Sequence, residues 1–220
     1  MREQLLEIYK LLFDRFGPQH WWPGETQFEI IIGAILTQNT SWKNVEKAIA
    51  NLKAVDHMTP VALHRLTLEQ LAELIRPAGY FNIKACRLRN FLDWLFENYE
   101  GQLENLEKID TVRLREELLA VKGIGPETAD SILLYAFNRP IFVIDAYTAR
   151  VMCRHYLAEL GIDYSQLQDL FQSNLPQDVE LFNEYHALLV HVGKDFCKPT
   201  AKCSGCPLEK LPHDPMIGKC

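Results

Sequence analysis

The sequence predicts an all-α protein with a short cysteine-rich appendage at its C-terminal end. Apolar residues recur at helical spacing through nearly the whole chain, as in amphipathic helices. Proline, glycine and small polar residues separate these segments, as expected at helix boundaries. The one strand-like run, residues 141–145, is too short to imply a sheet by itself.

Each predicted helix is marked by its own boundary signals. The first, residues 3–16, ends at a Gly-Pro pair. Thr26 is suited to cap the almost wholly apolar helix 27–38, and Ser41 is suited to cap the next helix, 42–55. The remaining helices are predicted at residues 60–65, 67–76, 82–99, 112–121, 126–137, 146–158, 164–173 and 178–193.

The composition is typical of a folded domain. The 220 residues are 48% hydrophobic and should bury a substantial core. No apolar run approaches the roughly 18 residues that span a bilayer, and the N-terminal helix is charged throughout, unlike a signal peptide. We therefore expect a cytoplasmic protein with no membrane partner, and nothing demands more than a monomer. The net charge of −6 argues mildly against nucleic acid, but local basic patches and backbone amides can still contact phosphates.

A Gly-x-Gly turn between two predicted helices is the first motif that suggests chemistry. Gly123 and Gly125, on either side of Ile124, allow a tight turn whose successive N–H groups can face one phosphate. Lys122 adds charge beside the turn, and the start of the second helix adds its dipole. The alternative is a glycine C-cap that only joins two core helices, and the two glycines alone favour that alternative.

The pattern after the hairpin favours the phosphate-binding turn over the simple C-cap. A further helix is followed by the apolar run 141–145, which ends in Asp145, and then by the helix 146–158. Asp145 can cap that helix, but it can also stand beside the hairpin with its carboxylate available for chemistry. Together with Gly123 and Gly125, it makes the sequence resemble the helix-hairpin-helix DNA glycosylases of the endonuclease III superfamily, over essentially the whole chain.

This resemblance implies a two-lobed helical fold with the active-site cleft between the lobes. The implied partner is double-stranded DNA with a damaged base, which such enzymes flip out before cleaving the N-glycosidic bond. Cleavage develops positive charge on the sugar. The carboxylate of Asp145 would stabilise that charge and orient or deprotonate the attacking water. The resemblance therefore implies a base-excision-repair enzyme of bacterial type, associated with the nucleoid through DNA.

Glu127 sits where the bifunctional members of the superfamily have a lysine. That lysine attacks the sugar and leads to strand cleavage through a Schiff base, which a glutamate cannot form. The resemblance therefore implies a monofunctional glycosylase that uses water as the nucleophile, with Glu127 in or near the catalytic pocket. The alternative is an ordinary first-turn acid that complements the helix dipole.

Three long blocks, one of which contains the hairpin turn, narrow the resemblance to one group of these glycosylases. Residues 20–42, 76–88 and 122–136 resemble the type III 3-methyladenine DNA glycosylases. This implies an alkylated purine as the substrate, 3-methyladenine first. Such a base carries delocalised positive charge, so it stacks well on electron-rich rings and leaves readily.

The same resemblance assigns the aromatic residues of the first block to a base pocket. Trp21 and Trp42 would flank the flipped base, and Pro23 would shape the pocket. Trp22 belongs to the same block, but for this residue a core anchor is the favoured interpretation.

Gln38 matches the wedge residue of the superfamily, which enters the duplex and fills the gap left by the flipped base. The alternative is a solvated residue at a loop tip. Asn39, beside it, is expected to contact DNA as well.

Two other functions remain open from the sequence. The same fold could remove uracil or thymine from mismatches, or an oxidised pyrimidine, with Glu127, Gln38 or Asn39 bonding to the edge of the neutral base. A non-catalytic module that binds lesions or junctions is the other alternative. Asp145 argues against it, because a pure binding module gains nothing from an acid aimed at DNA.

Four of the six cysteines crowd the last 24 residues, in the spacing Cys-x5-Cys-x2-Cys-x13-Cys. In a cytoplasmic protein such a group is more typical of metal binding than of disulfides. Four thiolates suit a 4Fe–4S cluster or zinc, and the spacing does not separate them. Endonuclease III-like enzymes carry a C-terminal 4Fe–4S loop of similar form, which favours the cluster, although type III relatives can lack it. The expected ligands are Cys197, Cys203, Cys206 and, on a much longer spacing, Cys220.

These assignments divide the chain by role. Residues 22–108 would form the core of the first lobe, with the pocket aromatics and the wedge loop. Residues 109–158 would hold the hairpin and the catalytic aspartate. Residues 1–21 and 159–196 would complete the second lobe, and 197–220 would be the cluster loop.

Overall fold

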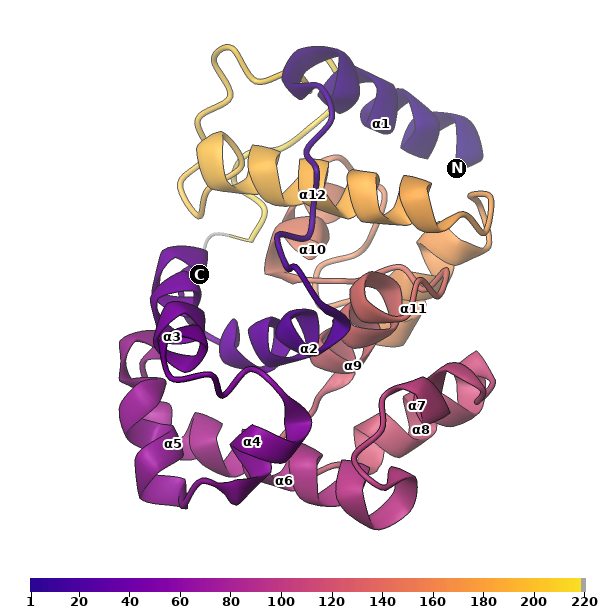
Figure 1. Ribbon diagram of the computed structural model, residues 1–220. Coiled ribbons are helices and arrows are strands. Elements are labelled where there is room, and N and C mark those ends of the chain that lie inside the picture. The colour runs from indigo at the N-terminus through magenta and orange to yellow at the C-terminus, as the bar shows by residue number, and fades with distance from the viewer. Residues whose placement is uncertain (219–220) are drawn as a thin grey trace. The chain divides into compact units, whose positions relative to one another are not determined.

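The computed structural model describes residues 1–218, and all regular secondary structure in that range is helical (Figure 1). This confirms the all-α prediction. Within the same residues, no helix has both the length and the apolar character needed to cross a membrane. The helices are α1 (Arg2–Phe16), α2 (Gln27–Leu36), α3 (Trp42–Ala54), α4 (Pro60–Arg65), α5 (Leu68–Leu74), η1 (Arg76–Ala78), α6 (Phe81–Tyr99), α7 (Glu104–Glu107), α8 (Thr111–Ala120), α9 (Pro126–Ser131), η2 (Ile132–Ala136), α10 (Ala146–Arg154), α11 (Tyr164–Gln172) and α12 (Val179–Asp195).

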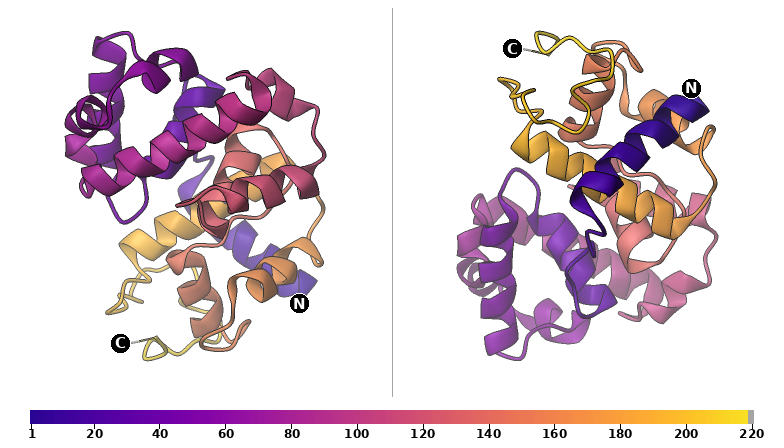
Figure 2. Two further views of the ribbon diagram at one scale, coloured as in Figure 1. Left: turned by 90° about the horizontal axis from the view of Figure 1, so that it is seen from below. Right: turned by 90° about the horizontal axis from the view of Figure 1, so that it is seen from above.

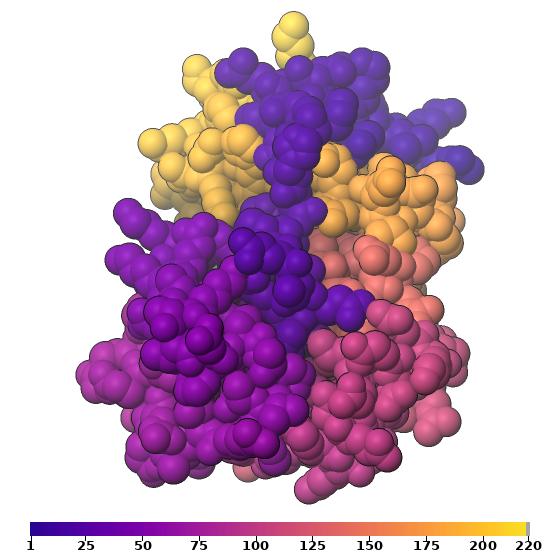
Figure 3. Space-filling model, in the orientation of Figure 1, coloured from indigo at the N-terminus to yellow at the C-terminus, as the bar shows by residue number. Residues whose placement is uncertain are grey.

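The chain divides into two compact units. One contains residues 23–139, and the other contains residues 1–22 together with the chain from residue 140 onward. The helix-hairpin-helix segment lies in the first unit, whereas Asp145 and the cysteine-rich loop lie in the second. In the space-filling view, side chains fill the gaps that the ribbons leave within each unit (Figure 3).

The unit 23–139 is organised around α2. Thr26 caps this helix, accepting a hydrogen bond from Glu29 N at 3.1 Å. Nearly every residue of α2 is buried, because the helix is apolar on all sides and packs against α3, α6, α9 and η2. Lys84, on α6, is also buried, and its Nζ donates to Leu36 O at 2.8 Å and to Ala78 O at 2.7 Å. This lysine therefore satisfies a carbonyl at the end of α2.

Three local features of this unit differ from the sequence-based expectation. The helix expected at 126–137 is α-helical only to Ser131 and continues as the π-helical turn η2. Between the helices predicted at 82–99 and 112–121, where no helix was predicted, the chain forms the short helix α7. Ser41 occupies the N-cap position of α3, but its side chain makes no capping hydrogen bond.

In the other unit, α12 packs against α10 and α1 (Figure 2). The core here is aromatic: Phe142 stacks on Phe171 with ring centroids 3.9 Å apart, and Tyr185 packs edge-on against Phe142. The Tyr185 hydroxyl donates to Leu5 O at 2.8 Å, which ties α12 to α1. Gly193 allows the close contact of α12 with α10, since a Cβ there would lie 2.5 Å from Cδ1 of Tyr147.

The extended run 141–145 forms no strand because side chains of α11 satisfy its backbone. Phe142 N donates to Gln172 Oε1 at 2.9 Å, and Gln168 Nε2 donates to Phe142 O at 2.7 Å. Ile144 N donates to the Tyr164 hydroxyl at 3.3 Å. The run is thus held in a defined path that delivers Asp145 to the start of α10.

Candidate active site and metal-binding loop

The Gly-x-Gly turn joins α8 to α9 as the sequence predicts. After α8, Ile124 N donates to Val121 O at 3.0 Å, which closes the turn. Helix α9 begins at Pro126 with Gly125 as its N-cap. This start has no side-chain cap, whereas several other helices in the described residues have one. The turn therefore leaves the approach to the first amides of α9 clear of a capping side chain.

The two glycines of the turn are needed for different reasons. Gly123 has a φ of +100°, and a Cβ added there would lie 2.4 Å from Cγ of Arg87. Gly125 has an ordinary extended φ of −96°, and a Cβ there would meet no atom within 4 Å. The fold itself therefore requires glycine at position 123. Position 125 requires it only if something outside the chain approaches the backbone.

Gln38 joins the loop after α2 to the hairpin. Its Nε2 donates to Gly123 O at 3.1 Å and to Thr128 Oγ1 at 2.8 Å, and Arg87 Nη1 donates to its Oε1. Asn39, the next residue, is exposed and has a φ of +54°. Asn39 is therefore the projecting residue of this loop, whereas the side chain of Gln38 is engaged inside its own unit.

The charged residues in and just after the hairpin turn are either exposed or buried in an ion pair. Lys122 and Glu127 are exposed, with Glu127 in the first turn of α9. Asp130 is 0% exposed and accepts hydrogen bonds from Nε and Nη2 of Arg115 at 2.6 and 3.0 Å. This bidentate pair ties α9 to α8.

Asp145 is the N-cap of α10. Its Oδ1 accepts a hydrogen bond from Thr148 N at 2.7 Å, and its Oδ2 lies 3.7 Å from Nε2 of His186 on α12. The side chains of Asp145 and His186 are 11% and 6% exposed. The capping role considered from the sequence is therefore confirmed, and the second carboxylate oxygen points to a histidine rather than to the helix.

The surroundings of Asp145 keep its carboxylate ionised. Burial by itself would raise the pKa of Asp145. Hydrogen bonding and charge from His186, together with the amide and hydroxyl of Thr148, outweigh that effect, so the pKa is lowered from its usual value. A buried carboxylate that stays charged at neutral pH can stabilise a nearby positive charge or accept a proton from water.

The tryptophans expected in the base pocket fall in different units. Trp21 and Trp22 pack edge to face, with centroids 5.7 Å apart and an interplanar angle of 81°. The Nζ of Lys194 lies over the Trp21 ring, 5.8 Å from its centroid. One face of Trp21 thus already attracts a cation within its own unit.

Trp42 and Pro23 lie together in the unit 23–139. They line a hollow of about 250 Å³ that also contains the carboxylate of Glu29, which is 6% exposed. Lys53 Nζ lies 2.9 Å from Glu29 Oε2. The hollow combines one large ring with buried charge. Its remaining lining residues are Glu46, Ile49 and Ala50.

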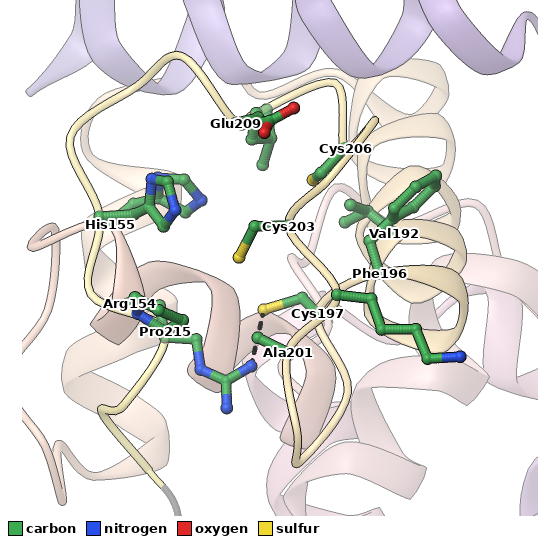
Figure 4. Close-up of a pocket in the computed structure, with 13 residues that line it drawn as sticks. Arg154, His155, Val192, Phe196, Cys197, Ala201, Cys203, Cys206, Glu209 and Pro215 are labelled. Carbon is green, nitrogen blue, oxygen red and sulfur yellow. Dashed lines mark hydrogen bonds between the residues drawn. The ribbon is translucent and has the colours of Figure 1, made fainter.

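Three of the four expected metal ligands line one hollow in the C-terminal loop (Figure 4). Cys197, Cys203 and Cys206 contribute their thiols to it, while Cys220 lies outside the described residues. Burial, and beyond it the neighbouring Cys197 and Cys203, raise the pKa of Cys206 to about 11. Thiols that disfavour each other's negative charge in this way suit a bound cation, which would deprotonate them. Within residues 1–218, no three side chains of ligand type converge closely enough to hold a single metal ion.

Arg154 holds this loop from α10. It is 2% exposed, and its Nη1 donates to Cys197 Sγ at 3.3 Å and to Lys198 O at 2.6 Å. It also donates to Pro199 O at 2.8 Å and to Ile217 O at 3.0 Å. One buried guanidinium thus fixes both ends of the loop and places positive charge beside a cysteine sulfur. The donor set fits a thiolate-bound cluster, to which it would supply anionic sulfur ligands and a neighbouring cation.

Comparison with known proteins identifies the family. The family model described as HhH-GPD superfamily base excision DNA repair protein matches residues 32–177, which is more than half of the chain. The chain belongs to this family. A Methanocaldococcus jannaschii protein provisionally named a DNA repair glycosylase is 49% identical over 211 residues, covering 95% of this chain and 96% of the relative.

Two solved structures of similar fold agree with this assignment. The H. pylori 3-methyladenine DNA glycosylase, bound to 1,N6-ethenoadenine, is 30% identical to this chain and has a TM-score of 0.74. The match covers 88% of this chain and 96% of the H. pylori chain. Endonuclease III in a non-covalent DNA complex is 22% identical to this chain and has a TM-score of 0.83. The match covers 98% of this chain and 96% of the other chain, and it supports the fold. The resemblance inferred from the sequence is confirmed, and the protein is a base-excision-repair DNA glycosylase of the endonuclease III superfamily.

Some residues predicted from the sequence lie together in this HhH-GPD protein, and other residues that support them were not predicted. Gly123 and Gly125 share one unit, and Pro23 and Trp42 share one hollow there, whereas Asp145 belongs to the other unit. The missed residues are His186 beside Asp145, Arg87 at Gly123, the Arg115–Asp130 pair, and Arg154 at the cysteine loop. Only His186 carried a signal: it is a polar residue on the apolar side of a predicted helix.

Proposed function

We propose that this glycosylase is monofunctional and removes alkylated purines of the 3-methyladenine type from duplex DNA. The observation that carries the proposal is the state of Asp145, a buried carboxylate kept ionised at the start of α10. A buried, charged carboxylate suits a reaction that develops a sugar cation.

In the proposed step, water attacks C1′ of the deoxyribose while the bond from C1′ to the base nitrogen breaks. The electron pair of that bond leaves with the base, which turns a cationic alkylated purine into a neutral leaving group. Asp145 stabilises the positive charge on the sugar and accepts the proton that water loses. His186, 3.7 Å from Oδ2, would hold the carboxylate in position as it takes up that proton.

Glu127 supports water as the nucleophile. A glutamate cannot form a Schiff base with the sugar, so this side chain provides no route to covalent strand cleavage. Its exposed position in the first turn of α9 is consistent with a role at the DNA surface.

The aromatic residues support a cationic base as the substrate. The hollow with Pro23 and Trp42 contains the buried carboxylate of Glu29, and Trp21 already has a lysine ammonium over one ring face. Electron-rich rings and nearby carboxylate both favour a positively charged base. The bound 1,N6-ethenoadenine of the H. pylori relative is a modified purine, which supports a purine lesion rather than a pyrimidine as the substrate. We assign Trp21 and Trp42 to the base, with Pro23 and Trp22 supporting them.

We further propose that the turn Lys122–Gly125 binds a DNA phosphate and that the loop after α2 enters the duplex. Asn39 is exposed at the tip of that loop and can contact DNA without rearrangement. Gln38 can act as the wedge only by exchanging its bonds to Gly123 and Thr128 for contacts with DNA. The loop from Cys197 would carry a 4Fe–4S cluster. The enzyme would act as a monomer on the DNA of the cytoplasm.

A panel of duplexes, each with one damaged or mismatched base, tests the proposal. The expected result is release of free base from 3-methyladenine-type lesions, with strand breaks only after alkali and no adduct trapped by borohydride. Preferred release of uracil, thymine or an oxidised pyrimidine would overturn the substrate assignment. A trapped adduct would overturn the monofunctional assignment.

A further inference from the structure

We propose that Arg87, on α6, is a positioning residue for the wedge: it holds the side chain of Gln38 in a retracted position, bonded inside its own unit, and so raises the free energy needed for that side chain to enter DNA. The inference rests on the proposed role of Gln38 as the wedge. Its consequence is specific. Removal of this arginine should tighten the binding of DNA that lacks a base, whereas removal of a cation normally weakens DNA binding.

Three groups hold the amide of Gln38 in the retracted position. Its Nε2 donates to Gly123 O at 3.1 Å and to Thr128 Oγ1 at 2.8 Å, which engages both hydrogens of that nitrogen. Its Oε1 accepts from Nη1 of Arg87. Because a backbone carbonyl can only accept and a guanidinium can only donate, the amide has one possible orientation. To reach DNA, Gln38 must break all three hydrogen bonds.

Arg87 makes the charged one of these bonds, and packing fixes its position. A hydrogen bond from an ionised donor is stronger than one between neutral groups. The Cγ atom of Arg87 lies so close to Gly123 that a Cβ on that glycine would clash with it. Both Arg87 and Gln38 are half-buried, so water can hydrate either group once their bond opens. The bond is therefore strong enough to hold the wedge, and it can open without leaving a fully buried charge unpaired.

Two neighbours of Arg87 on α6 hold backbone atoms instead of a side chain. Lys84 Nζ donates to Leu36 O at 2.8 Å, just before the loop after α2, and Asn90 Nδ2 donates to Lys122 O at 2.8 Å, in the hairpin turn. The three α6 residues are three positions apart, which places them along one side of the helix. Helix α6 thus braces the backbone of both DNA-facing segments, and Arg87 is the member of this set that acts on the wedge side chain.

The loop that carries Gln38 is also closed by its own backbone hydrogen bonds. Thr37 N donates to Gly33 O at 2.9 Å, and Thr40 N donates to Thr37 O at 3.1 Å. With the backbone held in this way, the exchange from the retracted to the inserted position needs rotation of one side chain and no rearrangement of the loop. Such rotations are fast, so the two positions are in equilibrium before DNA arrives.

This equilibrium determines the sign of the effect of Arg87. The apparent Kd of a ligand that needs a minor state is its intrinsic Kd divided by the fraction of molecules in that state. Loss of one hydrogen bond from a charged donor should raise that fraction about tenfold. If the guanidinium instead contacted DNA directly, its loss would weaken binding. The direction of the change therefore separates a positioning role from a direct contact.

Arg87→Met is the informative variant, because methionine keeps the Cγ that packs on Gly123 and removes the charge and the donor. Arg89→Met is the matched control: it removes the same charge from the same helix, at a guanidinium that donates to His64 O and Leu66 O. Arg87→Gln also keeps Cγ but is too short to replace Nη1, and it takes the place of Arg87→Met if that variant does not fold. Far-ultraviolet circular dichroism checks the fold of each full-length variant.

The assay is fluorescence anisotropy at one fixed salt concentration, with an undamaged duplex and with a duplex that carries a stable abasic analogue. The preference for the abasic duplex, expressed as the ratio of the two Kd values, cancels the general effect of losing a cation. We expect this preference to rise about tenfold in Arg87→Met and to stay within about twofold of wild type in Arg89→Met. In a Gln38→Ala background, Arg87→Met should change it by less than about twofold, because no wedge side chain is left to hold.

Insertion is followed directly by the fluorescence of 2-aminopurine placed opposite the abasic analogue. Its change on binding should depend on Gln38 and should be faster in Arg87→Met than in wild type. An unchanged or weaker preference in folded Arg87→Met would overturn the inference alone if that signal still depends on Gln38. An equal effect of Arg87→Met in the Gln38→Ala background would also overturn it. The same signal in wild type and Gln38→Ala would overturn both the wedge role and the inference. The abasic duplex has no base to release at that site, so none of these outcomes depends on which base the enzyme excises.

Discussion

The two glycines of the hairpin should respond oppositely to alanine. At position 123, a residue with a side chain at φ +100° costs about 1–3 kcal/mol. Overlap with Arg87 Cγ, 2.4 Å from the new Cβ, adds roughly 1–3 kcal/mol. Arg87 cannot swing away cheaply, because the clashing atom is near its backbone and its guanidinium donates to Gln38. We therefore expect Gly123→Ala to lower the free energy of unfolding by about 2–6 kcal/mol and Tm by roughly 4–24 °C.

Gly125→Ala is the matched variant with no such cost. Its φ is ordinary and its Cβ would meet nothing within 4 Å, so stability should stay within about 0.5 kcal/mol of wild type. A methyl group there would instead stand where a phosphate must approach the turn amides. Loss of one hydrogen bond to a charged group is worth about 1.5–3 kcal/mol, or roughly a 10- to 100-fold rise in Kd.

Both variants are assayed by thermal unfolding and by fluorescence anisotropy with a duplex that carries a stable abasic analogue, at one fixed salt concentration. Tight DNA binding by Gly125→Ala would refute the phosphate role of the turn. Unchanged Tm in Gly123→Ala would refute the steric reasoning about Arg87.

Three further predictions concern buried or half-buried polar groups of the same unit. Burial, and the nearby charge of Arg87, lower the pKa of Lys84 to about 8, so the unfolded chain binds more protons above that pH. Denaturant titrations should then show that the free energy of unfolding of wild type, relative to that of Lys84→Met, rises by about 2 kcal/mol between about pH 7 and pH 9.5. A difference that does not change with pH would contradict this. Asp130→Ala removes the carboxylate that pairs with the Arg115 guanidinium and should lower the free energy of unfolding by about 3 kcal/mol in the same assay. A decrease below about 1 kcal/mol would show that the pair contributes little to stability. Gln38→Ala breaks three hydrogen bonds and should cost about 2 kcal/mol, and an unchanged midpoint would show that these bonds do not hold the loop.

The features that could be predicted from the sequence are those set by local chemistry. Helical spacing gave the all-α class, and Thr26, Asp110 and Pro126 start their helices as their residue types suggest. The Gly-x-Gly turn and the helix-capping position of Asp145 were predicted for the same reason, because both depend on neighbours in the chain.

The features that could not be predicted depend on tertiary contacts. Nothing local tells that Asp130 is buried against Arg115, or that Arg87 fills the space beside Gly123. The extended run 141–145 looked like a strand, since its bonding to α11 side chains is not visible in the sequence. The π-helical turn η2 lies within a segment of ordinary helical composition, and we have no sequence-based account of it.

The most direct test of the central claim is single-turnover base release by Asp145→Asn from a duplex with one 3-methyladenine-type lesion. Asparagine also caps helices well, so α10 and the fold should persist. The account predicts a rate about a thousandfold below wild type with DNA affinity nearly unchanged, because only charge at the reacting sugar is removed. Release within about tenfold of wild type would contradict the assignment of Asp145 as the catalytic carboxylate.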